Sequence, residues 1–355
     1  MSRFFCEKFA ALTPYTPGEQ PRDQRYVKLN TNESPFPPSP KVIEAAQREA
    51  KRLNLYCDPE CTELKAAAAE LYGVRPQNVL PVNGSDEILY FAFLAFGDER
   101  HPFAAPDISY GFYPVYAEFC GVPLHEVPLK DDFSVDCRDY CGRNENIIIA
   151  NPNAPTGICI GVPEIEEIVR SNPDGVVIID EAYIDFGGES CVPLTKRYDN
   201  LLVIQTFSKS RSLAGARLGF AVGGEALIRD LNTVKYSVNP YNVNRMTQAA
   251  GVAAIRDGGY YAKNAETIKE NRAYAAKRLT ELGFTVLPSS ANFLFAGNGA
   301  VEGGELYRSL KRRGVLVRHF DKERISNFCR ITVGTKEQMD ILLTAIEAIL
   351  SEKGC

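Results

Sequence analysis

The sequence predicts an α/β protein with a large domain built on a mostly parallel sheet and a smaller α/β domain. Several segments are continuous apolar runs without the alternation of a strand that has one solvated face. Such runs are typical of parallel strands covered by helices on both faces. Most of them lead into a polar or glycine-containing turn that precedes a helical stretch. A length of 355 residues is sufficient for two domains.

The composition is that of a globular protein and argues against two classes of function. Hydrophobic residues make up 45% of the chain and charged residues 24%. The net charge is −5 without a basic patch, so no nucleic-acid partner is expected. There is no apolar run of about 18 residues, and residues 1–20 lack the pattern of a secretory signal. We therefore expect a cytoplasmic protein with no membrane partner.

The ten cysteines are scattered among residues that form hydrophobic cores. Cys57 and Cys61 have the same spacing as Cys137 and Cys141, so a four-cysteine zinc site is conceivable. Neither pair has the tight glycine turns that usually accompany structural zinc. We expect reduced thiols and no metal.

Up to about residue 242, strands and helices follow one another as expected for the large domain. Residues 1–27 contain three prolines and are expected to be irregular. Ser39 is placed to cap a helix that begins at Pro40. Gly84 and Ser85 open a further helix, whose free backbone amides favour an anion. Strands are expected at residues 79–82, 147–150, 176–180 and 201–205, and helices at 40–53, 61–72, 85–96, 107–120 and 163–171.

From about Val243 the pattern changes to longer helices separated by short strands, which predicts a second, smaller α/β unit. Helices are expected at residues 245–257, 260–282, 303–313 and 336–351, and strands at 285–287, 292–295, 315–318 and 329–333.

Four polar side chains follow the ends of expected strands in the large domain, namely Ser85, Asn153, Asp180 and Lys209. In open α/β sheets, ligands bind beyond the carboxyl ends of the strands. Polar groups offered by separate strand ends in one layer therefore predict a ligand site at this edge.

The stretch from Thr206 to Arg217 predicts the chemistry of that site. The hydroxyls of Thr206 and Ser208 and the guanidinium of Arg217 are suited to hold a phosphate. Lys209 would then lie beside that phosphate with a free amine. A pyridoxal-phosphate enzyme needs this pairing, because the amine bonds to the cofactor aldehyde while the phosphate anchors the ring. The alternative is a polar surface loop with a solvated lysine.

Six motifs together resemble those of the fold-type I pyridoxal-phosphate aminotransferases, and among them the histidinol-phosphate aminotransferases. The resemblance covers nearly the whole chain. The motifs are residues 29–33 (Leu-Asn-Thr-Asn-Glu), 83–87 (Asn-Gly-Ser-Asp-Glu), 151–157 (Asn-Pro-Asn-Ala-Pro-Thr-Gly), 180–183 (Asp-Glu-Ala-Tyr), 206–209 (Thr-Phe-Ser-Lys) with Arg217, and 329–334 (Cys-Arg-Ile-Thr-Val-Gly).

The resemblance implies a fold and a reaction. The large domain would span residues 28–242 around a mostly parallel seven-stranded sheet, and residues 1–27 and 243–355 would form the small domain. The reaction would move an amino group between L-histidinol phosphate and 2-oxoglutarate, with glutamate as a product, in histidine biosynthesis. The resemblance also implies a homodimer.

Roles for individual residues follow from the same resemblance. Lys209 would bind the cofactor and move the proton during transamination. Asp180 would keep the pyridine nitrogen protonated, and Tyr183 would donate to the ring phenolate oxygen. Tyr110 would stack on the ring. The phosphate would be bound by Ser85, Asp86, Thr206, Ser208 and Arg217, and by Tyr56 from the other subunit.

The substrate anion would be bound by Arg330, whose guanidinium is able to fork a carboxylate or a phosphate. Arg318, Tyr15 and Asn30 are further candidates for this pocket. The sequence departs from the family at Ala154, where an asparagine usually bonds the phenolate oxygen. Asn153 is the neighbouring candidate for that contact.

Several alternatives remain at this stage. An aromatic amino-acid aminotransferase or a threonine-phosphate decarboxylase would keep the fold and the cofactor. Each side chain also has an ordinary structural role open to it: Asp180 as a helix cap, Tyr110 and Tyr183 as core aromatics and Arg330 in a surface ion pair. A non-catalytic protein on the same fold would be expected to lack Lys209 or Asp180. A nicotinamide dehydrogenase is disfavoured, since no G-x-G-x-x-G follows a strand.

Overall fold

The computed structural model, which describes residues 2–10 and 12–354, is organised around a seven-stranded sheet. Across the sheet the order is β2-β8-β7-β6-β5-β3-β4, and only β8 runs against its neighbours. The strands are β2 (Val79–Val82), β3 (Phe103–Pro106), β4 (Leu124–Val127), β5 (Asn146–Ala150), β6 (Val177–Asp180), β7 (Leu201–Thr206) and β8 (Gly219–Gly223). The expected seven-stranded, mostly parallel sheet is confirmed.

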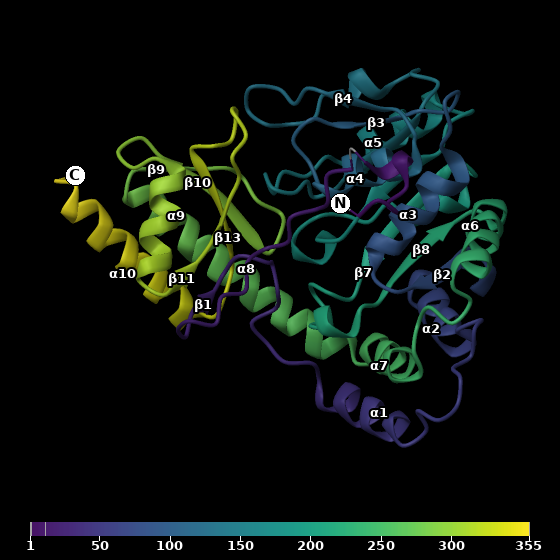
Figure 1. The fold of residues 1–355 in the computed structure, drawn as a ribbon. Helices are drawn as coiled ribbons and strands as arrows, with labels where there is room; N and C mark the ends of the chain where they lie inside the picture. The colour runs from purple at the N-terminus through teal and green to yellow at the C-terminus, as the bar shows by residue number, and fades with distance from the viewer. Residues whose placement is uncertain (1, 11, 355) are drawn as a thin grey trace.

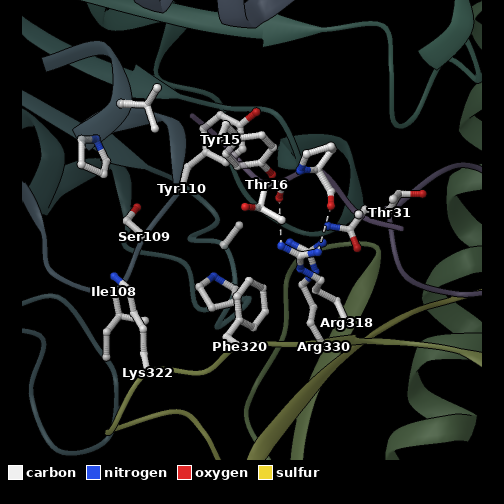
Figure 2. Close-up of a pocket in the computed structure, with 18 of the residues that line it drawn as sticks. Tyr15, Thr16, Thr31, Ile108, Ser109, Tyr110, Arg318, Phe320, Lys322 and Arg330 are labelled. Atoms are coloured by element: carbon white, nitrogen blue, oxygen red, sulfur yellow. Dashed lines mark hydrogen bonds between the residues drawn. The ribbon is translucent and has the colours of Figure 1, made fainter. Parts of the chain in front are cut away.

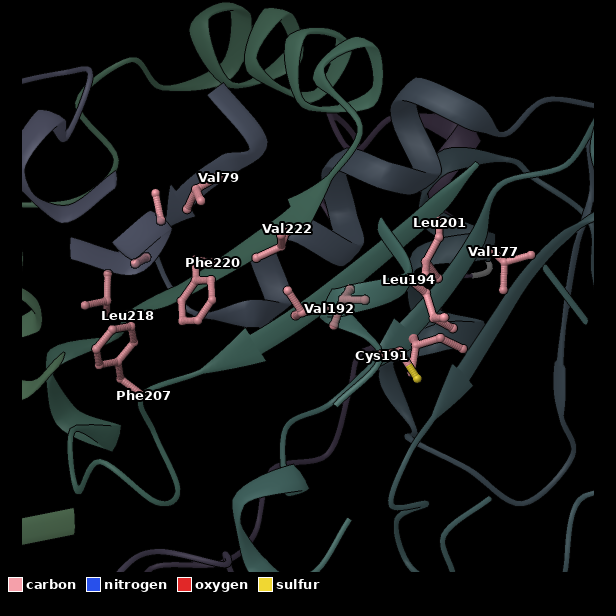
Figure 3. Packing of buried hydrophobic residues seen from close by; sticks show 14 of the residues in the cluster. Val79, Val177, Cys191, Val192, Leu194, Leu201, Phe207, Leu218, Phe220 and Val222 are labelled. Carbon is pink, nitrogen blue, oxygen red and sulfur yellow. The ribbon is translucent and has the colours of Figure 1, made fainter. Parts of the chain in front are cut away.

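Helices cover both faces of this sheet, which explains its continuous apolar strands. In β6, Val177 and Ile179 pack in one cluster with α2, α5 and α7, whereas Ile178 packs in another with α3, α4 and α6. Figure 3 shows part of the first cluster, where Val177 and Leu201 meet Cys191 and Leu194. The helices of this part are α1 (Pro40–Ala50), α2 (Thr62–Tyr72), α3 (Ser85–Phe96), α4 (Phe112–Cys120), α5 (Val162–Ser171), α6 (Glu225–Val238) and α7 (Arg245–Arg256).

A second unit, drawn in green to yellow on the left of Figure 1, surrounds a four-stranded antiparallel sheet of order β12-β13-β10-β9. Its core joins these strands to the helices that follow α7. The elements are α8 (Gly258–Glu281), β9 (Phe284–Val286), β10 (Phe293–Asn298), α9 (Gly303–Arg312), β11 (Val315–Leu316), β12 (Arg318–His319), β13 (Phe328–Thr332) and α10 (Lys336–Glu352).

The N-terminal segment crosses from one unit to the other, as the purple chain in Figure 1 shows. Its strand β1 (Val27–Lys28) pairs in parallel with β11, and Leu29 is buried in the core of the second unit. By contrast, α7 packs against α1 and α2 in the core of the first unit. By packing, α7 therefore groups with the first unit and Leu29 with the second, while the expected domain boundaries at 28 and 243 remain a prediction.

Four strands (β1, β3, β4 and β8) and one α-helix (α6) were not among the elements expected from the sequence. β3 is a four-residue strand that ends in proline, and β8 begins and ends with glycine, so neither has a strong strand signal. β4 has polar residues in its centre and α6 follows β8 directly. Among the described residues, no helix has the length and apolar character needed to span a membrane.

Candidate active site

Two connected cavities lie at the carboxyl edge of the large sheet, where the sequence predicts a ligand site. The inner cavity has a volume of about 380 Å³ and reaches Asp180, Ser208 and Arg217. The outer cavity has a volume of about 560 Å³ and extends to Arg318 and Arg330. The residues that line both are Thr31, Tyr110, Ala154, Tyr183 and Lys209.

Lys209 lies at the junction of the two cavities because it follows β7 by three residues. Its Nζ donates a hydrogen bond to the carbonyl oxygen of Thr31 at 3.3 Å and lies 5.7 Å from the centre of the Tyr183 ring. No ion pair with a carboxylate is formed by Lys209 within the described residues. The amine is therefore available to a ligand that enters either cavity.

Asp180 ends β6 and brings a carboxylate to the floor of the inner cavity, where it is 4% exposed. Its Oδ2 accepts a hydrogen bond from the Tyr113 hydroxyl at 3.1 Å, and its Oδ1 accepts one from the Ala182 amide at 3.2 Å. Burial raises the pKa of Asp180 to about 6. A buried carboxylate in this position favours a cation against it, as a protonated pyridine nitrogen would be.

The far end of the inner cavity has the groups expected of a phosphate cradle. Ser85 and Asp86 begin α3, and Arg217 Nη2 pairs with Asp86 Oδ2 at 2.9 Å. The Thr206 hydroxyl donates to Ser208 Oγ at 3.0 Å. Exposed helix amides, hydroxyls and a guanidinium together form an anion site.

A glycine is required on each side of this cradle. A Cβ on Gly84, which has φ of +80°, would lie 2.5 Å from Arg217 Nη2. A Cβ on Gly219 would lie 2.6 Å from the backbone nitrogen of Ser85. The two glycines thus allow the start of α3, Arg217 and β8 to lie close together, and the donors of the cradle fit the phosphate of pyridoxal phosphate.

Tyr110 and Tyr183 border both cavities, as expected for contacts with a flat ring. The Tyr110 hydroxyl donates to Asp86 Oδ1 at 2.8 Å. The Tyr183 hydroxyl accepts a hydrogen bond from Asn32 Nδ2 at 3.0 Å, and its ring packs edge-on against Phe293.

The structure does not bring Asn153 to the cavities. Its Nδ2 donates to Ile108 O at 2.9 Å and to Thr156 Oγ1 at 3.1 Å, and its Oδ1 accepts from Ser109 Oγ at 2.8 Å. The amide is 2% exposed and links its own loop to the loop after β3, while Ala154 lines both cavities. The predicted replacement of the missing asparagine by Asn153 is therefore not supported by the geometry.

Two arginines of the second unit line the outer cavity (Figure 2). Arg330 on β13 donates from Nη2 to Asn30 O at 3.1 Å, while its Nε is shielded from solvent and has no partner among the described residues. Burial lowers the pKa of Arg330. Arg318 donates to the carbonyl oxygens of Thr16 at 3.1 Å and Pro17 at 3.2 Å.

Tyr15 and Asn30 also line the outer cavity, as expected for substrate contacts. The Tyr15 ring stacks on Phe112 with 4.0 Å between ring centres. Asn30 donates from Nδ2 to Glu19 O at 2.9 Å. Tyr56 lines neither cavity of its own chain: it is 80% exposed and stacks on Tyr241 at 4.6 Å.

Three further residues contact the side chains of the site without having been predicted to do so. Thr31 and Asn32 contact Lys209 and Tyr183, and Tyr113 donates to Asp180. Thr31 and Asn32 belong to the motif at residues 29–33, but their partners lie over 150 residues away in the chain.

A family model described as aminotransferase class I and II matches residues 24–346 of the chain. A histidinol-phosphate aminotransferase of Brachyspira hyodysenteriae is 48% identical over 352 residues, which cover 99% of each chain. One from Acinetobacter baumannii is 49% identical over 340 residues, which cover 95% of this chain and 94% of the other.

Solved structures share the fold of this chain. The histidinol-phosphate aminotransferase of Sinorhizobium meliloti, solved in complex with pyridoxal-5'-phosphate, superposes with a TM-score of 0.84 at 24% identity and covers 93% of this chain and 92% of that one. The histidinol-phosphate aminotransferase of Clostridium acetobutylicum gives a TM-score of 0.85 at 22% identity, with coverage of 92% and 99%.

Proposed function

The chain belongs to the class I and II aminotransferases, which depend on pyridoxal phosphate, and from this we propose that it converts L-histidinol phosphate. The amino group passes to 2-oxoglutarate, which gives imidazole-acetol phosphate and L-glutamate in histidine biosynthesis. Relatives of that description that are 48% and 49% identical over nearly the whole chain support this substrate.

The observation that carries the proposal is the pair of arginines in the outer cavity. The hydrogen bonds of Arg330 and Arg318 go to backbone carbonyls, and within the described residues neither arginine forms an ion pair with a carboxylate. A guanidinium forks a phosphate as well as a carboxylate. One subsite is therefore able to bind histidinol phosphate by its phosphate and glutamate or 2-oxoglutarate by a carboxylate.

When bound, pyridoxal phosphate supplies the aldehyde that takes up the amino group and a ring that accepts an electron pair. Lys209 stands where its amine is able to take a proton from the substrate carbon and return it as general acid. Asp180 keeps a proton on the ring nitrogen, and Tyr113 holds its carboxylate. Residues 13–18 line the outer cavity.

We further propose a homodimer in which Tyr56 contributes to the phosphate site of the partner. The support is a group of exposed apolar side chains around it. Its members are Leu53, Leu55, Tyr56, Tyr236, Val238 and Tyr241, with exposures from 40% to 80%. The expected cytoplasmic location remains a prediction.

The test is an absorbance experiment on the purified holoenzyme. We expect the visible band of the bound cofactor to bleach when L-histidinol phosphate is added and to return with 2-oxoglutarate. If the band responds to phenylalanine or tyrosine instead, the substrate is an aromatic amino acid and the proposed histidinol phosphate is wrong. Release of carbon dioxide from threonine phosphate would indicate the decarboxylase. Absence of any cofactor band would contradict the proposed enzyme class.

A further inference from the structure

Three consecutive residues at the crossing between the two units each touch a different reactive side chain of the cavities. This arrangement joins the substrate subsite, the lysine and the tyrosine through one short segment. The contacts are Asn30 O with Arg330 Nη2 at 3.1 Å, Thr31 O with Lys209 Nζ at 3.3 Å, and Asn32 Nδ2 with Tyr183 Oη at 3.0 Å.

Asn32 is held so that the direction of its side-chain amide is determined. It is 1% exposed and has φ of 55°, a conformation that asparagine tolerates better than most residues. Its backbone N–H donates to Thr332 Oγ1 at 2.9 Å, and its carbonyl accepts from Asn292 Nδ2 at 3.0 Å. The backbone is therefore fixed on both sides.

The Thr332 hydroxyl binds the oxygen end of the Asn32 amide. Thr332 Oγ1 accepts from the Asn32 backbone N–H and donates its single proton to Asn32 Oδ1, which lies 3.1 Å away. With Oδ1 accepting from Thr332, Nδ2 is the end that donates to Tyr183 Oη. Tyr183 Oη accepts in this contact, so its own proton is not used there.

We propose that Asn32 is a positioning residue that makes Tyr183 a hydrogen-bond donor to the phenolate oxygen of the cofactor. Tyr183 borders both cavities, whereas Ala154 has no polar side-chain atom and Asn153 is fully engaged elsewhere. The hydrogen bonds form a chain in which the Asn32 backbone donates to Thr332, Thr332 to the Asn32 side-chain oxygen, and the Asn32 side-chain nitrogen to Tyr183. The Tyr183 hydroxyl then directs its proton into the inner cavity. This inference rests on the proposed cofactor-dependent function.

Thr332 also connects the hydrogen bonds of Asn32 and Tyr183 to the proposed substrate subsite. It lies two residues after Arg330 on β13, so the two side chains project from the same face of the strand. Its amide donates to Leu29 O at 2.9 Å, which fixes the segment before Asn32 to the same strand. The strand that binds the substrate anion therefore also sets the direction of the Tyr183 proton.

The experiment compares Asn32→Asp in the wild-type and in the Tyr183→Phe background. Aspartate has nearly the size of asparagine and tolerates the same backbone conformation. It places an acceptor oxygen where Asn32 has its donor Nδ2, so the Tyr183 hydroxyl donates to the aspartate and no longer into the cavity. We expect the pH midpoint of the visible absorption of the bound cofactor to rise by about one unit or more in the wild-type background. In the Tyr183→Phe background we expect a clearly smaller rise, because only the added negative charge remains.

The cofactor dissociation constant, measured by titration of the apoprotein, and the thermal unfolding of the apoprotein serve as second readouts. Equal shifts of the midpoint in both backgrounds would overturn the inference, since the effect would then be one of charge alone. Failure of the wild-type protein to bind the cofactor would instead contradict the proposed function. The two failures are thus distinguishable.

A matched pair at Thr332 tests the step that orients the amide, without any change in charge. Thr332→Val removes the proton given to Asn32 Oδ1 and is expected to raise the midpoint in the same direction. Thr332→Ser keeps the hydroxyl and is expected to restore the wild-type midpoint. An unchanged midpoint in Thr332→Val would overturn the proposed orientation, because the amide direction would not depend on that hydroxyl.

Discussion

The two residues that define the chemistry of the site are set in opposite surroundings. Asp180 is buried and is held by a hydroxyl and an amide, so its carboxylate has one orientation. Lys209 has a single hydrogen bond to a carbonyl, so its amine is able to move between the cavities. A fixed counter-charge and a movable amine are what proton transfer at a bound ring requires.

Asp180→Asn preserves the shape of the side chain but removes the charge that holds a proton on the ring nitrogen. We expect the turnover of histidinol phosphate to fall by about a hundredfold or more, while the phosphate cradle still binds the cofactor. Steady-state kinetics and the cofactor content of the purified variant measure the two effects. Asp98→Asn, in an exposed loop, is the control and is expected to behave as wild type.

Arg330→Lys keeps a positive charge in the outer cavity but loses the planar fork. We expect KM for histidinol phosphate to rise by about ten- to a hundredfold, with a smaller change in kcat, because one charge-assisted hydrogen bond contributes roughly 1.5–3 kcal/mol. Arg313→Lys, which changes an ion pair with Glu352 far from the cavities, is the matched control. Equal KM values for both variants would contradict the assignment of Arg330 to the anion subsite.

At the scale of elements, the site depends on how closely β8 approaches the start of α3. Gly219 opens β8 directly against the backbone of Gly84 and Ser85. This approach is what aims the first amides of α3 into the inner cavity. The turn after β6 buries a second carboxyl group, that of Glu181, which follows Asp180 in the chain.

Gly219→Ala inserts a methyl group between β8 and α3, where only backbone atoms surround it. We expect a loss of about 1–3 kcal/mol in the free energy of unfolding and a weaker affinity for the cofactor, since the start of α3 must shift. Urea unfolding and cofactor titration measure these. Gly299→Ala is the control, because no atom lies within 4 Å of the added Cβ. If Gly219→Ala has the unfolding free energy and the cofactor affinity of the wild type, the close approach of β8 to α3 does not position the start of α3.

Glu181→Gln tests the pH dependence of stability. Burial raises the pKa of Glu181 to about 7 although its oxygens accept from Ser190, Cys191 and Gln205. The folded apoprotein therefore holds a proton that the unfolded chain, with a pKa of about 4.3, has lost. Stability falls as the pH rises through this window, by at most about 1.4 kcal/mol per pH unit for one group.

Without this carboxyl, we expect the melting temperature of the apoprotein to fall less between pH 5 and pH 8 than that of the wild type. Asp180 contributes a fall of the same sign at lower pH, because its pKa is also raised by burial. Glu337→Gln, on the exposed start of α10, serves as a control. Parallel melting curves of Glu181→Gln and wild type would show that Glu181 is not the titrating group.

At the scale of the whole molecule, the site is assembled from both units and from the segment that crosses between them. The large sheet supplies Lys209 and Asp180, the second unit supplies Arg318 and Arg330, and residues 13–18 line the outer cavity. The exposed apolar group around Tyr56 lies outside this assembly in the single chain.

Sedimentation of the wild-type protein is expected to show a dimer. Tyr241→Arg places a charge beside Tyr56 and is expected to shift the equilibrium towards monomer and to weaken cofactor binding. Ile341→Arg introduces the same side chain at a comparably exposed site on α10 and should leave the dimer intact. A wild-type monomer with full cofactor affinity would contradict the proposed contribution of Tyr56.

The sequence predicted the convergence at the sheet edge because strand ends carry their following residues to one layer. Lys209, Asp180 and Ser85 were placed in this way, and all three line the inner cavity. Asn153 follows the same rule, but its amide is bound by Ile108 and Ser109 of the loop after β3. The direction of a side chain depends on nearby partners, which a strand-end argument does not contain.

Contacts between residues far apart in the chain were beyond the reach of the sequence. Tyr113 and Asn32 act on residues 67 and 151 positions away, through packing that no local pattern encodes. The short strands β3 and β8 were missed for a related reason. Their identity comes from pairing with neighbours rather than from their own composition.

The contact between Asn32 and Thr332 spans 300 residues, which has a consequence for synthesis on the ribosome. At roughly 5–20 residues per second, Thr332 is made about 15–60 s after Asn32. During that interval the polar segment around Asn32 and the edge of β1 have no partner from the second unit. The large sheet is complete well before the Tyr183 hydroxyl is oriented. A nascent chain therefore becomes competent for the proposed chemistry only when its last strand, β13, has left the ribosome.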